Sequence, residues 1–249
     1  MTAEQHAHDN TSHLDQHRRR MEVWREKYAI RACYRSWYER IRPFIADGPS
    51  VEIGGGFGGL KTYWQDLWTT DLIPVPGLDM VADAHRLPFD DGSIGNLLVI
   101  DLLHHLQDPH ALFDEAARVL RPGGRMLIIE PYITPVSYLA YRLLHHERIW
   151  FGGYHETTTK TDPWQGNLAV ANLLFSREAK TWPQRHPTLR VIRKRKFSFF
   201  DFQLAGGFKP YAFVKSPRLY DFFLTLDRRM DFLAPLVGFR IFCVIENVR

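Results

Sequence analysis

Hydrophobic residues along the chain follow two patterns, short apolar runs and stripes with helical spacing. The clearest run covers residues 94–100, a continuous apolar segment of the kind that is buried in parallel sheets. Other strands are predicted at 51–53, 68–72, 78–82, 125–131, 189–200 and 239–248. Helical spacing of apolar residues predicts helices at 14–44, 60–67, 112–120, 136–144 and 168–175. Alternating strands and helices indicate an α/β sheet with its ligand at the carboxyl ends of the strands.

A glycine-rich segment, Gly54-Gly55-Gly56-Phe57-Gly58-Gly59, joins the first predicted strand to the helix predicted at 60–67. Glycine lets the backbone turn tightly and come close to a ligand. The pattern Gly54-x-Gly56-x-x-Gly59 fits the dinucleotide fingerprint, so an NAD-dependent oxidoreductase is one interpretation. Glu52 favours S-adenosyl-L-methionine (SAM) instead. Its carboxylate would attract the ammonium group of a methionine moiety and repel a pyrophosphate.

Acidic residues stand at or just after the ends of the predicted strands. The carboxyl ends of parallel strands share one edge of a sheet, so these side chains are expected to gather there. The residues are Glu52, Asp71, Asp83, Asp101 and Glu130. Asp71, about 20 positions beyond the glycines, is placed to accept hydrogen bonds from ribose hydroxyls. Its alternative role is to cap a helix or a turn.

The region from Val51 to Pro131 resembles the class I SAM-dependent methyltransferases, especially the small-molecule group called type 11. Besides the glycine segment and Asp71, three motifs carry the resemblance: Asp83-Ala84-x-x-Leu87-Pro88-Phe89, Leu103-His104-His105-Leu106-x-Asp108-Pro109 and Arg118-Val119-Leu120-Arg121-Pro122-Gly123-Gly124. The resemblance implies an α/β, Rossmann-like seven-stranded sheet with helices on both faces and a final antiparallel hairpin. It implies SAM as cofactor, with the methionine end at Glu52 and the glycines, the ribose at Asp71 and the adenine at Asp83 and Ala84. The full set of predicted cofactor-binding residues is Glu52, Gly54, Gly55, Gly56, Gly58, Asp71, Leu72, Asp83, Ala84, Ile100 and Asp101.

One departure from the family is the dipeptide Gly95-Asn96, which stands where the family commonly has an aspartate. The absence of this aspartate predicts that a contact which stabilises the fold is weakened. The predicted organisation has four parts: an N-terminal tail and helical lid (1–46, the tail being 1–12), a SAM-binding Rossmann-like core (47–131), a helical cap insertion (132–188), and the C-terminal strands of the core with a second cap insertion at about 201–236 (189–249).

Methyl transfer by in-line displacement requires an acceptor held about 3 Å from the methyl carbon. Transfer to a hydroxyl also requires a base, and histidine suits because its pKa lies near neutrality. His105, after the fourth strand, and His155, in the predicted cap, are the candidate catalytic residues. Their alternative roles are packing under the cofactor and a surface loop. No metal site is predicted, because the adjacent residues of His145-His146-Glu147 would point apart on a helix.

Charge is divided unevenly along the chain. Residues 1–130 hold 14 Lys+Arg and 19 Asp+Glu, a balance of −5, and residues 131–249 hold 18 and 9, a balance of +9. The basic half, with Arg193, Lys194, Arg195 and Lys196, predicts an anionic or amphiphilic small-molecule acceptor, such as a sugar, a lipid-linked molecule or a secondary metabolite. A solvated basic face is the alternative.

The remaining composition narrows the class of protein. No apolar run reaches the roughly 18–20 residues of a membrane span, which leaves peripheral membrane contact open. Cys33 and Cys243 are too few for a disulfide framework, and the polar N-terminus is unlike a secretory signal, so a cytoplasmic location is predicted. No nucleic-acid module is recognised, and the sequence does not determine the oligomeric state. The predicted function is a SAM-dependent methyltransferase, with O-methyl transfer favoured over C- or N-methyl transfer. A non-catalytic SAM-fold binding protein is a second alternative to it.

Overall fold

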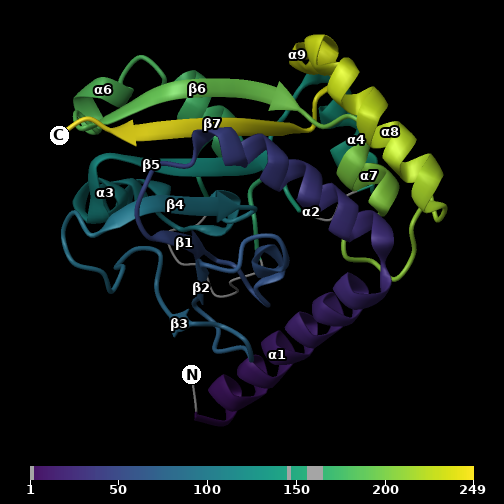
Figure 1. Ribbon diagram of the computed structural model, residues 1–249, viewed down its shortest axis with the longest axis horizontal. Helices are drawn as coiled ribbons and strands as arrows, with labels where there is room; N and C mark the ends of the chain where they lie inside the picture. The colour runs from purple at the N-terminus through teal and green to yellow at the C-terminus, as the bar shows by residue number, and fades with distance from the viewer. Residues whose placement is uncertain (1–2, 145–146, 156–164) are drawn as a thin grey trace.

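A seven-stranded sheet forms the centre of the molecule (Figure 1). The computed structural model describes residues 3–144, 147–155 and 165–249, and the side chains of residues 3–13 and Leu144 lie outside that description. The strand order is β3-β2-β1-β4-β5-β7-β6, with β7 antiparallel to both of its neighbours and the other pairs parallel. The strands are β1 Ser50–Ile53, β2 Leu67–Asp71, β3 Met80–Val81, β4 Ile94–Ile100, β5 Leu120–Pro131, β6 Leu189–Phe197 and β7 Arg240–Asn247.

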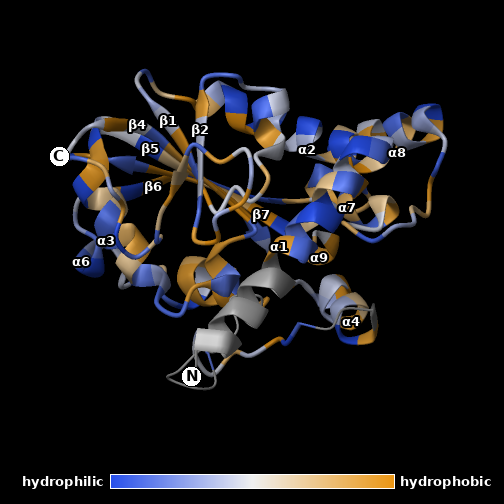
Figure 2. Cartoon of the chain, turned by 90° about the horizontal axis from the view of Figure 1, so that it is seen from below, coloured by the Kyte–Doolittle hydropathy of each residue, from blue (hydrophilic) through white to orange (hydrophobic). Residues whose placement is uncertain are grey.

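Strand β4 shows why the sheet needs helices on both of its faces. Successive side chains of a strand point to opposite sides. Leu97 and Val99 enter one apolar cluster with Phe113 of helix α3 (Pro109–Val119), whereas Leu98 and Ile100 enter another with Trp37 of helix α2 (Tyr28–Ile41). The hydrophobic strands accordingly lie inside the molecule, between the helices (Figure 2). The predicted α/β, Rossmann-like sheet with helices on both faces is confirmed.

The helices lie before, between and after the strands. Those of the first 131 residues are α1 Ala3–Glu26, α2 Tyr28–Ile41 and α3 Pro109–Val119, with short 3-10 turns η1 Arg42–Phe44, η2 Gly59–Thr62 and η3 Leu103–His105. The later ones are α4 Pro135–Leu144, α5 Val170–Asn172, the π-helical turn η4 Leu173–Arg177, α6 Trp182–Arg185, α7 Asp201–Ala205, α8 Pro217–Arg229, η5 Asp231–Leu233 and α9 Ala234–Val237. None of the described helices is long and apolar enough to cross a bilayer.

The predicted helix at 60–67 is wrong. The chain forms only the short turn η2 there, and Leu67 already begins β2. Strands β1 and β2 run parallel with Ser50 opposite Leu67, so residues 54–66 must return the chain along the length of a strand. The glycines occupy the first part of that connection, and glycine disfavours a helix. Leu60 is nevertheless buried, as its spacing predicted.

The N-terminal helices pack beside the second insertion. Helix α1 spans Ala3–Glu26, so the backbone of most of the predicted tail is helical. Helix α2 contacts α7 and α8, and its Trp37 Nε1 donates to Asp201 Oδ2 at 2.7 Å. Segments from opposite ends of the chain therefore meet on the face of the sheet that α2 covers.

The contact at Gly95-Asn96 is stronger than predicted. Asn96 is buried, its Oδ1 accepts from Ala46 N at 2.8 Å, and its Nδ2 donates to Ala46 O at 2.8 Å and to Ser50 Oγ at 3.0 Å. A carboxylate has no donor for the Ala46 carbonyl, whereas an amide satisfies both backbone groups of Ala46. The predicted weakening is therefore wrong.

Candidate cofactor and active site

The glycine loop turns directly after β1. Gly54, Gly56 and Gly58 have φ of +72°, +55° and +71°, which an L-residue with a side chain rarely adopts. The loop is fixed by a hydrogen bond from Gly55 N to Thr70 O at 2.8 Å and by one from Gly56 N to Asp71 Oδ2 at 2.9 Å. A Cβ on Gly55 would lie 2.8 Å from Glu52 Oε2. The loop thus turns tightly, and at Gly55 it leaves no room for a side chain.

Glu52 lies buried beneath this loop. Its Oε2 has no hydrogen-bond partner within the described structure. Burial, with repulsion from Asp71 as a second cause, raises the pKa of the Glu52 carboxyl to about 8. A buried carboxyl with an open acceptor is a fitting partner for a cationic group such as the ammonium of SAM.

Asp71 and Asp83 follow the next two strands. Asp71 accepts backbone hydrogen bonds on both oxygens, from Gly56 N and from Ile73 N at 3.0 Å, so its carboxylate is held in place at the loop. The neighbouring Leu72 side chain is exposed, while Ala84 is buried. Asp83 accepts from His85 N, and its side chain contacts His85 Nδ1. Partial desolvation of the carboxyl raises the Asp83 pKa, but the contacts with His85 outweigh it and the net shift is downward. Asp71 and Asp83 thus lie at the carboxyl ends of β2 and β3, at the edge of the sheet where the sequence predicted them.

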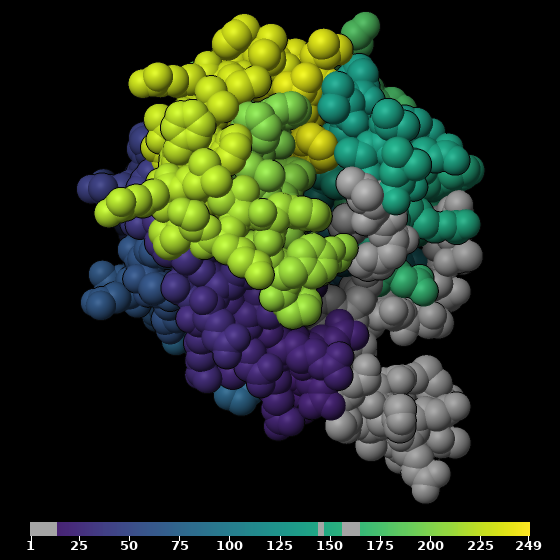
Figure 3. Space-filling view, turned by 90° about the vertical axis from the view of Figure 1, so that its right-hand side faces the viewer, coloured from purple at the N-terminus to yellow at the C-terminus, as the bar shows by residue number. Residues whose placement is uncertain are grey.

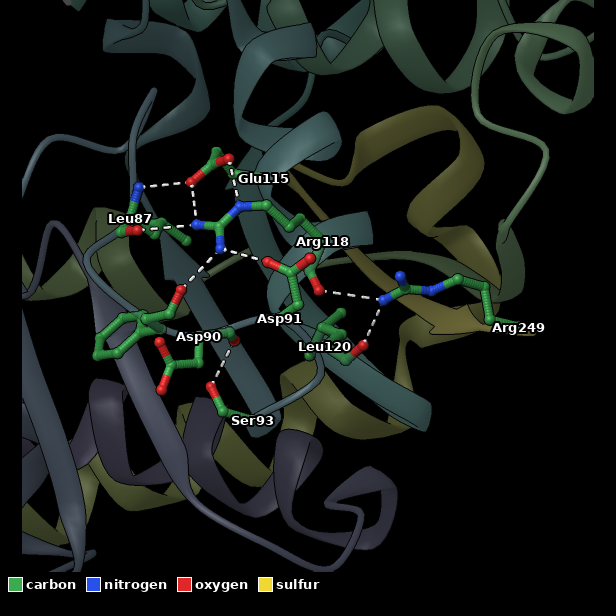
Figure 4. A network of polar contacts seen from close by, with 9 residues as sticks. Leu87, Asp90, Asp91, Ser93, Glu115, Arg118, Leu120 and Arg249 are labelled. Carbon is green, nitrogen blue, oxygen red and sulfur yellow. Dashed lines mark hydrogen bonds and ion pairs between the residues drawn. The ribbon is translucent and has the colours of Figure 1, made fainter.

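The segment that follows Ala84 is anchored to helix α3 by Arg118 (Figure 4). Arg118 donates to the carbonyls of Leu87 and Phe89 at 2.9 and 2.7 Å and pairs with Glu115 and Asp91. Glu115 in turn accepts from Leu87 N at 2.7 Å. Two of the motifs are thus connected physically. The motif that begins at Asp83 supplies the segment, and the motif that begins at Arg118 supplies its anchor.

Asp101 marks the end of β4, next to the buried Ile100, and has a φ of +53°. Its carboxylate pairs with Arg240 of β7. The Arg240 guanidinium is buried, with Cζ 4.2 Å from the Trp37 ring centroid and 4.6 Å from that of Phe202. The N-terminal helices, the second insertion and the last strand therefore meet at one residue of the site.

His104 was not among the predicted site residues, although it stands beside His105 in the motif. It is buried, and its Nδ1 lies 2.6 Å from Glu130 Oε2, while its Nε2 lies 3.6 Å from Glu147 Oε2. Glu130 also accepts from Leu102 N and Leu103 N at 2.7 and 2.6 Å. Burial by itself lowers the His104 pKa, but Glu130, Glu147 and Asp101 raise it, and the net shift is upward. Glu130 was the feature of the sequence that could have pointed to His104, because it is an acidic residue at a strand end with no assigned role.

The two predicted catalytic histidines differ in their surroundings. His105 is half-buried, its ring centroid is 4.1 Å from that of His104, and its Nδ1 is 3.4 Å from Gln165 O. His155 contacts the Leu106 carbonyl through Nε2, so that nitrogen must carry the proton. His105 therefore lies beside His104, whereas Nε2 of His155 is engaged with the backbone.

Two sets of side chains around His104 have the spacing of a cation site. The ligand atoms of His104, His105 and Glu147 lie within 4.8 Å of one another, as do those of Asp101, His104 and Glu130. His145 and His146 of the triplet considered in the sequence lie outside the described residues, as does Glu156 beside His155.

Helix α1 adds two basic side chains that were not among the predicted site residues. A Cβ on Gly56 would lie 3.3 Å from His17 Cε1, so this buried imidazole packs against the glycine loop. Arg20 lies one turn further on, with Cζ 5.5 Å from the Phe208 ring centroid. Burial lowers the pKa of Arg20, while the charges of Asp101, Glu147 and Asp71 act in the opposite direction. Helix α1 thus brings a guanidinium near the carboxylates of the site.

The basic run at 193–196 lies elsewhere. It belongs to β6, the outer strand of the sheet, separated from β4 by β5 and β7. Arg195 pairs with Asp231 and Lys194 donates to Phe175 O at 2.8 Å. This placement gives no support to the prediction that the basic run faces the acceptor. Two of its charged side chains, Lys194 and Arg195, contact other parts of the fold.

Comparisons with known proteins agree with this geometry. A family model described as a methyltransferase domain matches residues 52–128. A demethylmenaquinone methyltransferase of Mycobacterium sp. (strain KMS) is 29% identical over 145 residues, 56% of this chain and 58% of that protein. A 27-O-demethylrifamycin SV methyltransferase of Amycolatopsis mediterranei is 41% identical over 54 residues, 22% of this chain and 20% of that protein.

A solved structure extends the comparison to the whole fold. The SAM-dependent methyltransferase, possible histamine N-methyltransferase, of Thermotoga maritima superimposes with a TM-score of 0.55 at 13% identity, over 96% of this chain and 99% of that one. The sheet and the loop at its carboxyl edge thus define a Rossmann-like methyltransferase fold. Residues 52–128 form a class I SAM-dependent methyltransferase domain, and its cofactor is S-adenosyl-L-methionine. The chain spans at most about three fifths of the length of the menaquinone and rifamycin relatives.

Proposed function

We propose that this protein transfers the methyl group of SAM to a small-molecule acceptor by in-line displacement. The observation that carries the proposal is the carboxyl edge of the sheet, where the glycine loop, the buried Glu52 and the His104–Glu130 pair lie at the ends of β1, β4 and β5. When bound, SAM supplies a methyl group already activated on its sulfonium. The chain then has to hold the cofactor, orient the acceptor and accept a proton.

For the cofactor, we assign the ammonium group to Glu52 and the ribose hydroxyls to Asp71. The adenine would lie against Leu72 and Ala84 with Asp83 near its amino group, and Ile100 and Asp101 would close the site from β4. Arg20 would bind the cofactor carboxylate, because a guanidinium matches carboxylate geometry. The open Oε2 of Glu52 and the position of Arg20 beside the acidic edge support these assignments.

For the acceptor, we favour a hydroxyl of a sugar, a lipid-linked molecule or a secondary metabolite, used in a cytoplasmic pathway of natural-product or polysaccharide biosynthesis. The name of the rifamycin relative specifies an oxygen, which supports O-methyl transfer. The name of the menaquinone relative points to another acceptor class. C-methyl and N-methyl transfer are the alternatives.

Proton removal is assigned to His104, with His105 and His155 as the competing candidates. Glu130 holds the His104 proton on Nδ1 and leaves Nε2 as the basic nitrogen, which is how a carboxylate orients a general base. The raised pKa of His104 strengthens it as a base and keeps it protonated to a higher pH. Turnover should therefore rise with pH through a pKa above the usual value for histidine.

The test compares His104→Asn, His105→Asn and His155→Asn at saturating SAM. We expect His104→Asn to lower turnover by about 100-fold or more while SAM still binds. Glu130→Gln should move the acidic limb of the pH profile to lower pH, because it removes the charge that raises the His104 pKa. Full activity of His104→Asn would assign proton removal to another group.

A separate test concerns a metal ion. Unchanged activity after chelation would show that the His104–His105–Glu147 spacing serves no metal.

The proposal as a whole is tested by mass spectrometry of candidate acceptors incubated with SAM. A mass increase of one methylene unit on an acceptor supports methyl transfer, and fragmentation then identifies the methylated atom. Tight binding of SAM without product from any acceptor class would favour the non-catalytic alternative.

A further inference from the structure

The helix that follows β5 presents an apolar stripe to the outside. Ser137 of α4 is buried, and Tyr141 Oη donates to Phe239 O at 3.0 Å, so these residues form the inner side. Val136, Leu139 and Leu143 recur at helical spacing on another side, and Leu139 and Leu143 are 62% and 72% exposed. An aliphatic stripe of this kind is usually covered by something.

The same surface continues onto the end of the second insertion. Helix α4 contacts α9, α9 contacts η5, and η5 contacts α8. Phe232 of η5 is 75% exposed, Leu236 of α9 is 57% exposed and Phe222 of α8 is 58% exposed. Figure 3 shows these segments, α4 in teal and α8 to α9 in yellow, side by side on one face of the molecule. We call the exposed surface of α4, α8, η5 and α9 the cap face.

The exposed charge around the cap face is positive. Residues 132–144 and 206–238 carry the exposed basic side chains Arg142, Lys209, Lys215, Arg218, Arg228 and Arg229. Of these, Arg228 pairs with Glu39. The three acidic residues of the same segments are engaged in the fold. Asp227 is buried and accepts three backbone N–H groups, Asp231 pairs with Arg40 at 2.9 Å, and Asp221 accepts from Tyr28 Oη.

We propose that the cap face binds the surface of a membrane that contains anionic lipids. Exposed aliphatic and aromatic side chains enter the headgroup region, and the surrounding lysines and arginines attract the lipid charge. The combination of apolar and basic side chains favours a membrane over a second copy of the chain. A two-fold interface would place these basic side chains against their own copies, where they repel each other.

The test measures co-sedimentation of the protein, without SAM, with vesicles of phosphatidylcholine alone and of phosphatidylcholine mixed with phosphatidylglycerol. We expect binding to the anionic vesicles to be about 10-fold stronger or more at low salt, and to weaken as salt screens the charges. The variant Leu139→Ser/Leu143→Ser/Phe232→Ser should lose most of this binding. The matched control, Trp68→Ser/Ile192→Ser/Val248→Ser, changes exposed apolar residues on other parts of the molecule and should bind like the parent.

Thermal melting and SAM titration confirm that both variants are folded. The proposal is overturned if the parent does not bind anionic vesicles, if it binds both kinds equally, or if the control loses as much binding as the cap-face variant. Sedimentation velocity gives the remaining outcome. A dimer that the cap-face variant dissociates, without vesicle binding, would assign the face to a second copy. Because vesicle binding is measured without SAM, it stands or falls separately from methyl transfer.

Discussion

Glu52 shows how one buried carboxyl can couple the cofactor to pH. The pKa of Glu52 is about 8 in the folded chain, against 4.5 for a solvated glutamate. Between these values the folded state holds a proton that the unfolded state has lost, so the Glu52 contribution to stability falls as pH rises through that window. A cofactor ammonium favours the ionised carboxylate and reverses the effect, because binding then releases the proton.

We therefore expect the affinity for SAM to increase with pH from about 6 to about 8. Isothermal titration in two buffers of different ionisation enthalpy should detect the released proton. Glu52→Gln should bind SAM more weakly and lose the part of the pH dependence that belongs to this residue. If the variant and the parent show the same dependence on pH, the proton comes from another group.

Arg20 is expected to recognise the cofactor carboxylate. Arg20→Met should weaken SAM by about 10–100-fold, the scale of a charge-assisted hydrogen bond. The affinity for decarboxylated SAM should be the same in the variant and the parent. Arg18→Met, which removes an exposed arginine of the same helix, is the control. Equal losses for both ligands would mean that Arg20 only positions helix α1.

At the scale of elements, Gly95 decides how closely β4 approaches the segment before β1. Gly95 N donates to Pro49 O at 2.9 Å, and a Cβ on this residue would lie 2.3 Å from Asp47 O. The contact is with backbone, which cannot move aside as the end of a side chain can. The dipeptide Gly95-Asn96 is therefore a packed joint between β4 and residues 46–49.

Gly95→Ala should lower the free energy of unfolding by about 1–3 kcal/mol, the usual range for overpacking. Gly153→Ala is the matched control, because the φ of Gly153 lies outside the left-handed region and the nearest neighbour of an added Cβ would lie 3.8 Å away. Denaturant unfolding of the two variants measures the difference. Equal stability would show that the chain before β1 can shift without loss.

At the scale of the whole molecule, cofactor binding should stabilise the native state because the site is assembled from several elements. SAM at about 100 times its Kd adds about 2.7 kcal/mol. For a chain of this size that raises Tm by roughly 5–10 °C. NAD at the same concentration should leave Tm unchanged, and this comparison in a thermal melt separates the methyltransferase from the oxidoreductase interpretation. A rise in Tm with NAD and none with SAM would favour the oxidoreductase interpretation.

The sequence by itself determined the features that local patterns encode. The apolar run of β4 was predicted with its observed bounds, Ile94–Ile100, because a strand buried on both faces needs apolar residues throughout. The glycine segment and the acidic residues at strand ends were predicted to share one edge of the sheet, since parallel strands place their carboxyl ends together. The helix at 60–67 failed, because helical spacing does not reveal how little chain remains after the glycines for the return to β2.

Only the tertiary structure decided which side chains meet. His104 pairs with Glu130 on the neighbouring strand, and Asp101 is held by Arg240 from the last strand. Helix α1 brings His17 to a loop that follows it by more than thirty positions and Arg20 near the carboxylates, while the basic run of β6 lies at the outer edge of the sheet. Such pairings depend on strand order and helix packing. Local periodicity contains no information about them, so the sequence predicted which residues gather at the carboxyl edge but not which side chains they pair with.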